Sequence, residues 1–265
     1  MIIKDQLNRN IELTHTPQRI VSCVPSITEL LFQFVSPEQV VGRTKFCIHP
    51  KIKITSIPKL GGTKNLNLNA IKELTPDLII ANKEENDKEQ IEQLEHYIPT
   101  FVSDISDIED TCDLIKHLGI IFSKEEKAIQ MIKEIENAII EGPDLKDISA
   151  LYLIWKDPYM SVGSDTYIDD MLRLAQFKNV LSHKTRYPEL TTDDINSIKP
   201  EVLLLSSEPF PFAQKHIDEL RKSLNYSPTI CLVDGEMFSW YGTKTLAGLK
   251  YAKKLRISLQ KTHHP

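Results

Sequence analysis

The chain is poor in cysteine and has no long apolar run. Four cysteines in 265 residues are too few for a disulfide-stabilised scaffold, and none forms the Cys-x-x-Cys pair typical of structural zinc. No segment approaches the roughly 18 uninterrupted apolar residues of a membrane-spanning helix. The net charge of −5 gives no overall attraction to nucleic acid or to an anionic membrane. With 41% hydrophobic and 26% charged residues, the composition excludes disordered and fibrous proteins and predicts one large domain or two smaller ones.

The motifs of the common enzyme classes are also missing. There is no GxSxG, Walker A or HExxH sequence, and Gly61-Gly62 is an isolated pair rather than a phosphate-binding loop. Cys47 and His49 could form a nucleophile pair with Asp234 downstream, or part of a soft-metal site. Side chains two apart on a strand do not easily hydrogen-bond each other, however, and two ligands do not make a metal site. We therefore predict a protein that is not an enzyme and has no cofactor or metal of its own.

The first twenty residues contain neither an apolar segment nor a small-residue cleavage site of the kind found in export signals. As written, the chain is expected in the cytoplasm. If an export signal has been trimmed, the same protein would work in the periplasm or at the cell surface.

Short apolar runs alternate with amphipathic stretches along the chain, which is typical of an α/β fold. The predicted strands are Arg19–Val24, Val40–Gly42, Leu78–Ala81, Thr100–Ser103, Ala150–Ile154, Val202–Leu205 and Thr229–Val233. The predicted helices are Ser26–Phe34, Asp87–His96 and Ser106–Leu118, of which the first and last open with capping boxes. A longer helix is predicted from Lys124 to Glu141, with a capping box at Ser123, a stop at Gly142-Pro143 and a stripe of Ile129, Ile132, Ile135 and Ile139.

The second half of the chain resembles the first. Residues 71–80 align with residues 195–204 at a constant offset of 124, and the segments at Thr100 and Thr229 are also alike. Any helix–proline–strand connection could look this way; the other reading is two related α/β lobes, residues 1–122 and 143–265, bridged by a helix at 123–142. Because ligands of open α/β sheets bind beyond the carboxyl ends of the strands, two such lobes would hold a ligand in the cleft between them.

The segment RIVSCVPSITELLF at 19–32 resembles the opening of the helical-backbone (type III) substrate-binding proteins of ABC importers, which carry cobalamin, ferric siderophores or haem. Further similarities follow in order: VGRT at 41–44 with His49-Pro50, KLGG at 59–62, LTPDLII at 74–80 and the segment 234–241. They span about residues 10 to 255 and are most similar to cobalamin-binding members. The resemblance implies two Rossmann-like α/β lobes joined by a single long backbone helix.

Aromatic and polar residues in the loops expected at strand ends are the candidate ligand contacts. Aromatic faces would hold a planar macrocycle or a catecholate chelate, and a few polar groups would orient it. Alternatively, the aromatic side chains only cap the cores of the lobes and the basic ones are solvated surface charge. The candidate residues are Ser26, Phe46, Cys47, Lys64, Lys83, Trp155, Tyr159, Tyr187, Phe210, Trp240 and Tyr241.

These features favour a monomeric protein that captures a corrinoid or chelated-iron ligand for ABC-type import. The alternative is a cytoplasmic binder or sensor of the same fold without a transporter. In the family, one acidic residue on each lobe pairs with arginines of the permease. The resemblance and the offset of 124 both place these positions at Asn69 and Asp193, and Asn69 lacks the charge.

Overall fold

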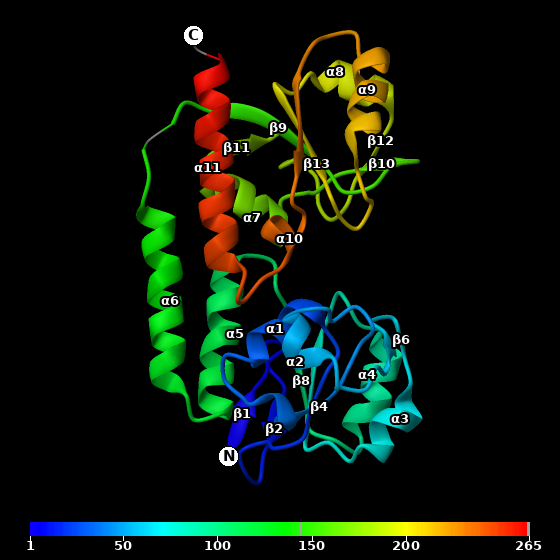
Figure 1. Ribbon diagram of the computed structural model, residues 1–265, viewed down its shortest axis with the longest axis vertical. Helices are drawn as coiled ribbons and strands as arrows, with labels where there is room; N and C mark the ends of the chain where they lie inside the picture. Colours follow the sequence, from blue (N-terminus) through cyan, green and yellow to red (C-terminus); the bar gives the residue numbers. More distant parts are fainter. Residues whose placement is uncertain (144, 264–265) are drawn as a thin grey trace. The chain divides into compact units, whose positions relative to one another are not determined.

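Two lobes, each built around a parallel sheet, make up the part of the chain that the computed structural model describes, residues 1–143 and 145–263 (Figure 1). One unit comprises residues 1–105, 109–134 and 241–243, and the other comprises residues 106–108, 135–240 and the chain from 244 onward. The predicted α/β fold class is confirmed.

The first lobe contains a four-stranded sheet in the order β4-β3-β7-β8, in which all neighbours are parallel. These strands are β3 (Ile20–Ser22), β4 (Val40–Arg43), β7 (Leu78–Asn82) and β8 (Thr100–Ser103). Two short hairpins flank it: β1 (Ile2–Lys4) with β2 (Asn10–Glu12), and β5 (Gly61–Gly62) with β6 (Asn65–Leu66). Its short helices are α1 (Pro25–Leu31), the 3-10 turn η1 (Pro37–Gln39), α2 (Lys51–Ile54), α3 (Leu68–Glu73) and α4 (Lys88–Glu95). All residues of β3, β7 and β8 are buried, as expected for a parallel sheet covered on both faces.

The second lobe repeats this plan with a parallel sheet in the order β11-β9-β13-β14. Its strands are β9 (Ile148–Leu153), β11 (Phe177–Asn179), β13 (Val202–Ser206) and β14 (Thr229–Val233), with the small antiparallel pair β10 (Tyr159–Met160) and β12 (Glu189–Leu190). Its helices are α7 (Tyr167–Leu174), α8 (Thr192–Ile198), α9 (Gln214–Ser223), α10 (Glu236–Ser239) and α11 (Thr245–His263).

The offset of 124 residues marks a true structural repeat. Helix α3 begins at Leu68 and α8 at Thr192, and the strands that follow them, β7 and β13, also begin 124 residues apart. Both helices are capped alike: the Asn67 side chain accepts a bond from the N–H of N3, and Thr191 does the same. A generic helix–proline–strand connection would not reproduce the order of a whole sheet. The chain therefore contains two related lobes.

Helix α6 (Glu125–Ile140) lies within the predicted range, but its start differs from the prediction. Ser123 has a φ of 53°, and the N–H groups of Ser123 and Lys124 bond to the carbonyls of Ile120 and Gly119. Ser123 therefore terminates the preceding helix, α5 (Ile108–Ile121), in a left-handed turn and does not cap α6.

The first predicted capping box is wrong for a related reason. Helix α1 begins at Pro25, one residue before Ser26, and Val24 is its N-cap without a side-chain bond. Proline suits the first helical position because its φ is already helical and its missing N–H would have no partner there. Ser26 consequently lies inside the helix, with a buried side chain.

The predicted isoleucine stripe of α6 is shifted around the helix. Ile129 is 65% exposed, whereas Ala128, Ile135 and Ala138 are each less than 5% exposed. The buried positions thus recur at intervals of seven and three residues, which keeps one face of the helix in the core.

We expect Ile135→Ala to destabilise the protein by about 2–4 kcal/mol, because it removes buried methyl groups and leaves a cavity. Ile129→Ala, on the exposed face of the same helix, should change stability by less than about 0.5 kcal/mol. Urea unfolding followed by circular dichroism measures both. Equal effects of the two substitutions would contradict the assignment of the buried face.

Candidate functional site

Most of the sequence-predicted ligand residues follow the carboxyl ends of the parallel strands. In the second lobe, Trp155 lies two residues beyond β9 and Phe210 four beyond β13. In the first lobe, Ser26, Phe46 and Lys83 follow β3, β4 and β7. Parallel strands all leave the sheet at the same edge, so these loops gather at one edge of each sheet.

Trp155 is the exposed end of an aromatic cluster in the second lobe. Its ring lies 5.7 Å from that of Phe210 in an edge-to-face arrangement, and Phe210 in turn contacts Phe212 at 4.8 Å and His216 at 5.2 Å. Trp155 is 40% exposed and Phe212 only 6%. Burial lowers the pKa of His216, whose Nδ1 accepts the Ala213 N–H, so this imidazole is neutral at pH 7. The cluster offers one apolar ring to a ligand, supported from behind by buried rings.

Trp240 is held by a carboxylate that the sequence analysis did not select. Its Nε1–H donates to Glu208 Oε1 at 2.9 Å, and the Ser239 hydroxyl donates to the same oxygen at 2.8 Å. The Lys244 ammonium lies 4.5 Å from the centre of the Trp240 ring and is paired with Glu236. Burial, with a further contribution from the Glu236 charge, raises the pKa of Glu208 despite the two hydrogen bonds.

The Glu208 loop is packed against the end of β14. The Ser206 hydroxyl donates to the Glu208 carbonyl, and Tyr152 donates to Ser206 in turn. A Cβ at position 235 would lie 2.5 Å from Glu208 Cγ, so only Gly235 allows this approach. The repeat could have revealed Glu208, because the offset of 124 makes it equivalent to Glu84.

Tyr241 clusters with the first lobe, although it directly follows Trp240 of the second. Its hydroxyl donates to Glu85 Oε1 at 3.3 Å, and the Ser26 and Ser103 side chains lie beside it. The side chain is buried, and burial together with the Glu85 charge raises its pKa well above the ordinary value. Ser26 and Tyr241 are thus brought together, as two polar groups beside the strand ends of one lobe.

The two candidate lysines of the first lobe are engaged within that lobe. The Lys64 ammonium donates to the carbonyls of Glu84 at 2.6 Å and Asn86 at 3.1 Å. Lys83 forms an ion pair with Asp104 at 2.6 Å. Both lysines therefore stabilise loop conformation at the strand ends.

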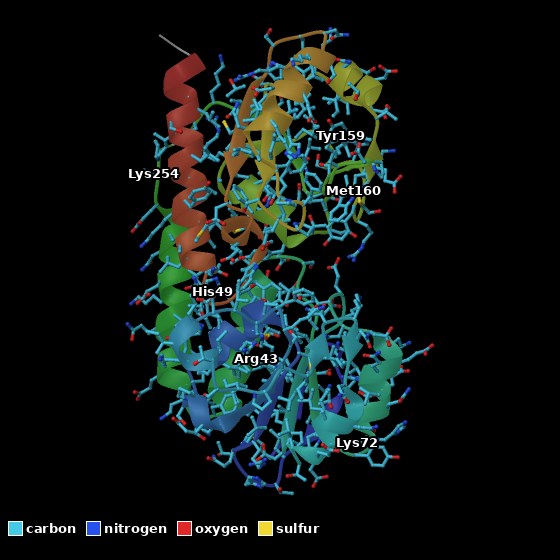
Figure 2. The ribbon with its side chains drawn as sticks, turned by 45° about the vertical axis from the view of Figure 1, so that its right-hand side comes forward. Arg43, His49, Lys72, Tyr159, Met160 and Lys254 are labelled. Carbon is cyan, nitrogen blue, oxygen red and sulfur yellow. The ribbon has the colours of Figure 1, made fainter. Side chains whose placement is uncertain are left out.

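The position of Cys47 corrects its assignment as a ligand contact. Its side chain is fully buried. The sulfur accepts a hydrogen bond from the Thr28 hydroxyl at 3.0 Å and shares another with the Thr44 hydroxyl at 3.1 Å. Burial raises the pKa of the thiol, and the Arg43 guanidinium bonds to the Cys47 carbonyl at 2.9 Å. A protonated, enclosed thiol is neither a nucleophile nor a ligand contact. Figure 2 shows Arg43 and His49 in this part of the first lobe.

The other candidates differ in exposure. Phe46 is 49% exposed, and the Lys45 ammonium lies 4.9 Å from its ring centre. Tyr159 is half-buried on β10, next to Met160 in Figure 2. Tyr187 is half-buried with the Arg186 guanidinium 5.5 Å from its ring. Phe46 and Trp155 are therefore the two most exposed aromatic candidates.

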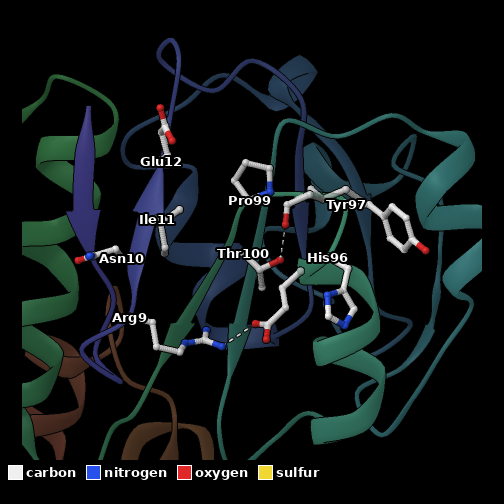
Figure 3. Close-up of a pocket in the computed structure, with 10 residues that line it drawn as sticks. Arg9, Asn10, Ile11, Glu12, His96, Tyr97, Pro99 and Thr100 are labelled. Atoms are coloured by element: carbon white, nitrogen blue, oxygen red, sulfur yellow. Dashed lines mark hydrogen bonds and ion pairs between the residues drawn. The ribbon is translucent and has the colours of Figure 1, made fainter.

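A hollow of about 520 Å³ lies at the other end of the first lobe's sheet, beside β2 and the first residue of β8 (Figure 3). It is lined in part by Arg9, Tyr97 and Thr100. The guanidinium of Arg9, which Figure 3 labels, is neutralised by Asp5 and Glu95. This hollow contains none of the predicted ligand residues.

A family model described as "Periplasmic binding protein" matches residues 20–229, most of the chain. The chain belongs to this family. Its members are binding proteins and not enzymes, as the sequence predicts, and the molecule they carry is cargo rather than a cofactor. Within the described residues no group of three or more His, Cys, Asp or Glu side chains is placed to hold a metal ion.

The relatives of this chain include a component of an ABC transporter. An ABC transporter substrate-binding lipoprotein of Bacillus subtilis, YvrC, is 27% identical over 220 residues, covering 76% of this chain and 68% of the relative. A vitamin B12-binding protein of Vibrio campbellii is 24% identical over 195 residues, covering 71% and 70%. The crystal structure of the vitamin B12-binding protein BtuF of Vibrio cholerae has the same fold, with a TM-score of 0.80 and 15% identity over 93% of this chain and 99% of that one.

No helix in residues 1–143 and 145–263 is both long and apolar enough to cross a bilayer. None of the four cysteines, all of which lie in that part of the chain, forms a disulfide.

We expect Cys47 to resist alkylation in the folded protein, because its thiol is buried and its pKa is raised. With iodoacetamide at pH 8, mass spectrometry should find Cys231, which is half-buried, modified before Cys47. Denaturation in urea should abolish the difference. Rapid labelling of native Cys47 would reopen the nucleophile hypothesis.

Proposed function

We propose that this protein is the substrate-binding component of an ABC importer and captures a corrinoid or an iron chelate. The observation that carries the proposal is the placement of two tryptophans, Trp155 and Trp240, beyond the carboxyl ends of the second lobe's strands. Membership of the family and the vitamin B12-binding relative support it. The location of the ligand in a cleft between the lobes remains a prediction from the sequence.

The mechanism is binding without bond making. Trp155 presents its ring to an apolar face of the ligand, while Trp240 is fixed in orientation by Glu208. Aromatic surface of this kind supplies affinity by burial, and neighbouring polar groups set the orientation. The protein acts as a monomer and delivers its cargo to a permease, without a nucleic-acid partner.

The sensor of the same fold without a transporter is the second candidate, favoured by the uncharged Asn69. Fractionation of cells that express the natural gene separates the two functions. Recovery outside the cytoplasm favours import, and retention in the cytoplasm favours the sensor.

Saturable quenching of tryptophan fluorescence by cyanocobalamin, haemin or a ferric siderophore tests ligand binding. Trp155→Ala should weaken binding by about 1–3 kcal/mol, the range for stacking on one aromatic ring. Tyr97→Ala is the control, because Tyr97 is 74% exposed and belongs to the hollow of Figure 3. A flat titration with every ligand would refute the proposed function.

Permease docking can be tested at Asn69 and Asp193. Both are exposed, and each is the second residue of its helix, α3 or α8. Because a desolvated charge pair at an interface can contribute several kcal/mol, Asn69→Glu should strengthen docking and Asp193→Ala should abolish it. Asp218→Ala, an exposed acid elsewhere on the second lobe, should have no effect. The measurement is a pull-down with the permease encoded nearest to this gene, and tight binding that neither change alters would contradict the assignment.

A further inference from the structure

We propose that Glu208 sets the charge selectivity of this ligand site: it favours ligands that donate hydrogen bonds, such as the amide side chains of a corrinoid, over polycarboxylate chelates such as ferric citrate. The inference rests on the proposed function. It follows from a comparison of the lysines near the strand ends, several of which are paired with carboxylates, with the Glu208 carboxylate, which is not paired with a basic side chain of the described residues.

The positive groups near the strand ends are largely occupied. Lys156 pairs with Glu219, and Lys244 pairs with Glu236, with only 20% and 12% of the lysine side chains exposed. In the first lobe, Lys64 and Lys83 are bound to backbone carbonyls and to Asp104, as described above. An anionic ligand would have to break the ion pairs of Lys156, Lys244 and Lys83 to gain these partners, whereas the carbonyls bound to Lys64 orient its ammonium and leave its charge in place. Lys45, which is stacked on Phe46, and Lys64 have no carboxylate partner among the contacts described.

Glu208, in contrast, keeps acceptor capacity. The Ser239 and Trp240 donors both bond to Oε1, which leaves Oε2 to accept a hydrogen bond from a ligand. A half-buried carboxylate gains more from a donor than an exposed one does, since it has lost part of its hydration. A ligand carboxylate at the same place would instead meet like charge from Glu208 and Asp234, while the Glu236 charge is paired with Lys244.

The repeat adds acidity at the equivalent place in the first lobe. Glu84, the counterpart of Glu208, and Glu85 follow β7 just as Glu208 follows β13. Glu85 accepts a hydrogen bond from the Tyr241 hydroxyl, as Glu208 does from the Trp240 indole. Glu85 after β7 and Glu208 after β13 therefore each accept a hydrogen bond from an aromatic side chain, although Glu85 is one residue past the position equivalent to Glu208.

Equilibrium titrations of the full chain with cyanocobalamin and with ferric citrate test the selectivity. The unmodified protein should bind cyanocobalamin at least about tenfold more tightly, the scale of one hydrogen bond to a charged group. Glu208→Gln keeps an oxygen acceptor for Trp240 but removes the charge, and should reduce this ratio about tenfold. Asp218→Asn, an exposed acid on α9, is the matched control and should leave the ratio unchanged.

The outcomes separate this inference from the proposed function. If ferric citrate binds as tightly as cyanocobalamin, and Glu208→Gln does not change the ratio, the selectivity is refuted while the import function stands. If neither compound binds, both are refuted.

A ligand-free measurement tests whether Glu208 positions Trp240. In a Trp155→Phe background, Trp240 is the remaining tryptophan, and its emission should change as Glu208 takes up a proton. The midpoint of this change should lie at a pH above the ordinary pKa of glutamate, because burial raises the pKa of Glu208. Glu208→Gln should abolish the transition. Ser239→Ala, which removes one donor to the carboxylate, should move it to higher pH. Emission that does not vary between pH 4 and pH 8 would overturn the positioning role.

The neighbouring groups that titrate or carry charge are Asp234, Glu236, Lys244 and Tyr152. Glu236→Gln in the same background identifies the group: because it removes a like charge, the transition should move to lower pH and persist. Loss of the transition in this variant would assign it to Glu236 and contradict the role of Glu208.

Discussion

The structure depends on the parallel pairing of two central strands, β7 and β13, with neighbours on both sides. Every residue of both strands is buried, so neither can exist without helices on both faces of its sheet. Parallel pairing also requires the chain to cross back over the sheet after each strand, which brings every strand out at the same edge. The aromatic and acidic loops gather at that edge because the strands pair in parallel, whatever the sequences of the loops are.

The loops at this edge satisfy their polar groups internally before any ligand is present. Lysines that the sequence suggests as ligand contacts bond to carbonyls or carboxylates of the protein. The Arg43 guanidinium donates hydrogen bonds to backbone carbonyls of the segment that follows it. A loop that is fixed in this way loses little conformational entropy when a ligand binds. The ion pairs of Lys83, Lys156 and Lys244 leave these loops with fewer unpaired positive charges than their composition suggests, which is why charge selectivity falls to residues such as Glu208.

Trp240 and Tyr241 show how closely the two lobes share one stretch of chain. One side chain donates to a glutamate of the second lobe and the other to a glutamate of the first. Trp240 and Tyr241 are therefore joined by a peptide bond, yet each side chain is hydrogen-bonded within a different compact unit. Trp240 and Tyr241 are neighbouring aromatic residues, and no local sequence pattern shows that one bonds to Glu208 and the other to Glu85.

Local patterns in the sequence determined the α/β class, most strand positions and the extent of α6, because buried strands and amphipathic helices depend on hydrophobic periodicity over a few residues. The offset of 124 residues determined the repeat and the equivalence of Asn69 and Asp193. Tertiary structure alone decided that Ser123 ends a helix, that Ile129 faces solvent, that Cys47 is enclosed, and that Glu208 holds Trp240. Each of these depends on contacts between residues far apart in the chain or between successive elements, and the free energy of such contacts is absent from any local pattern.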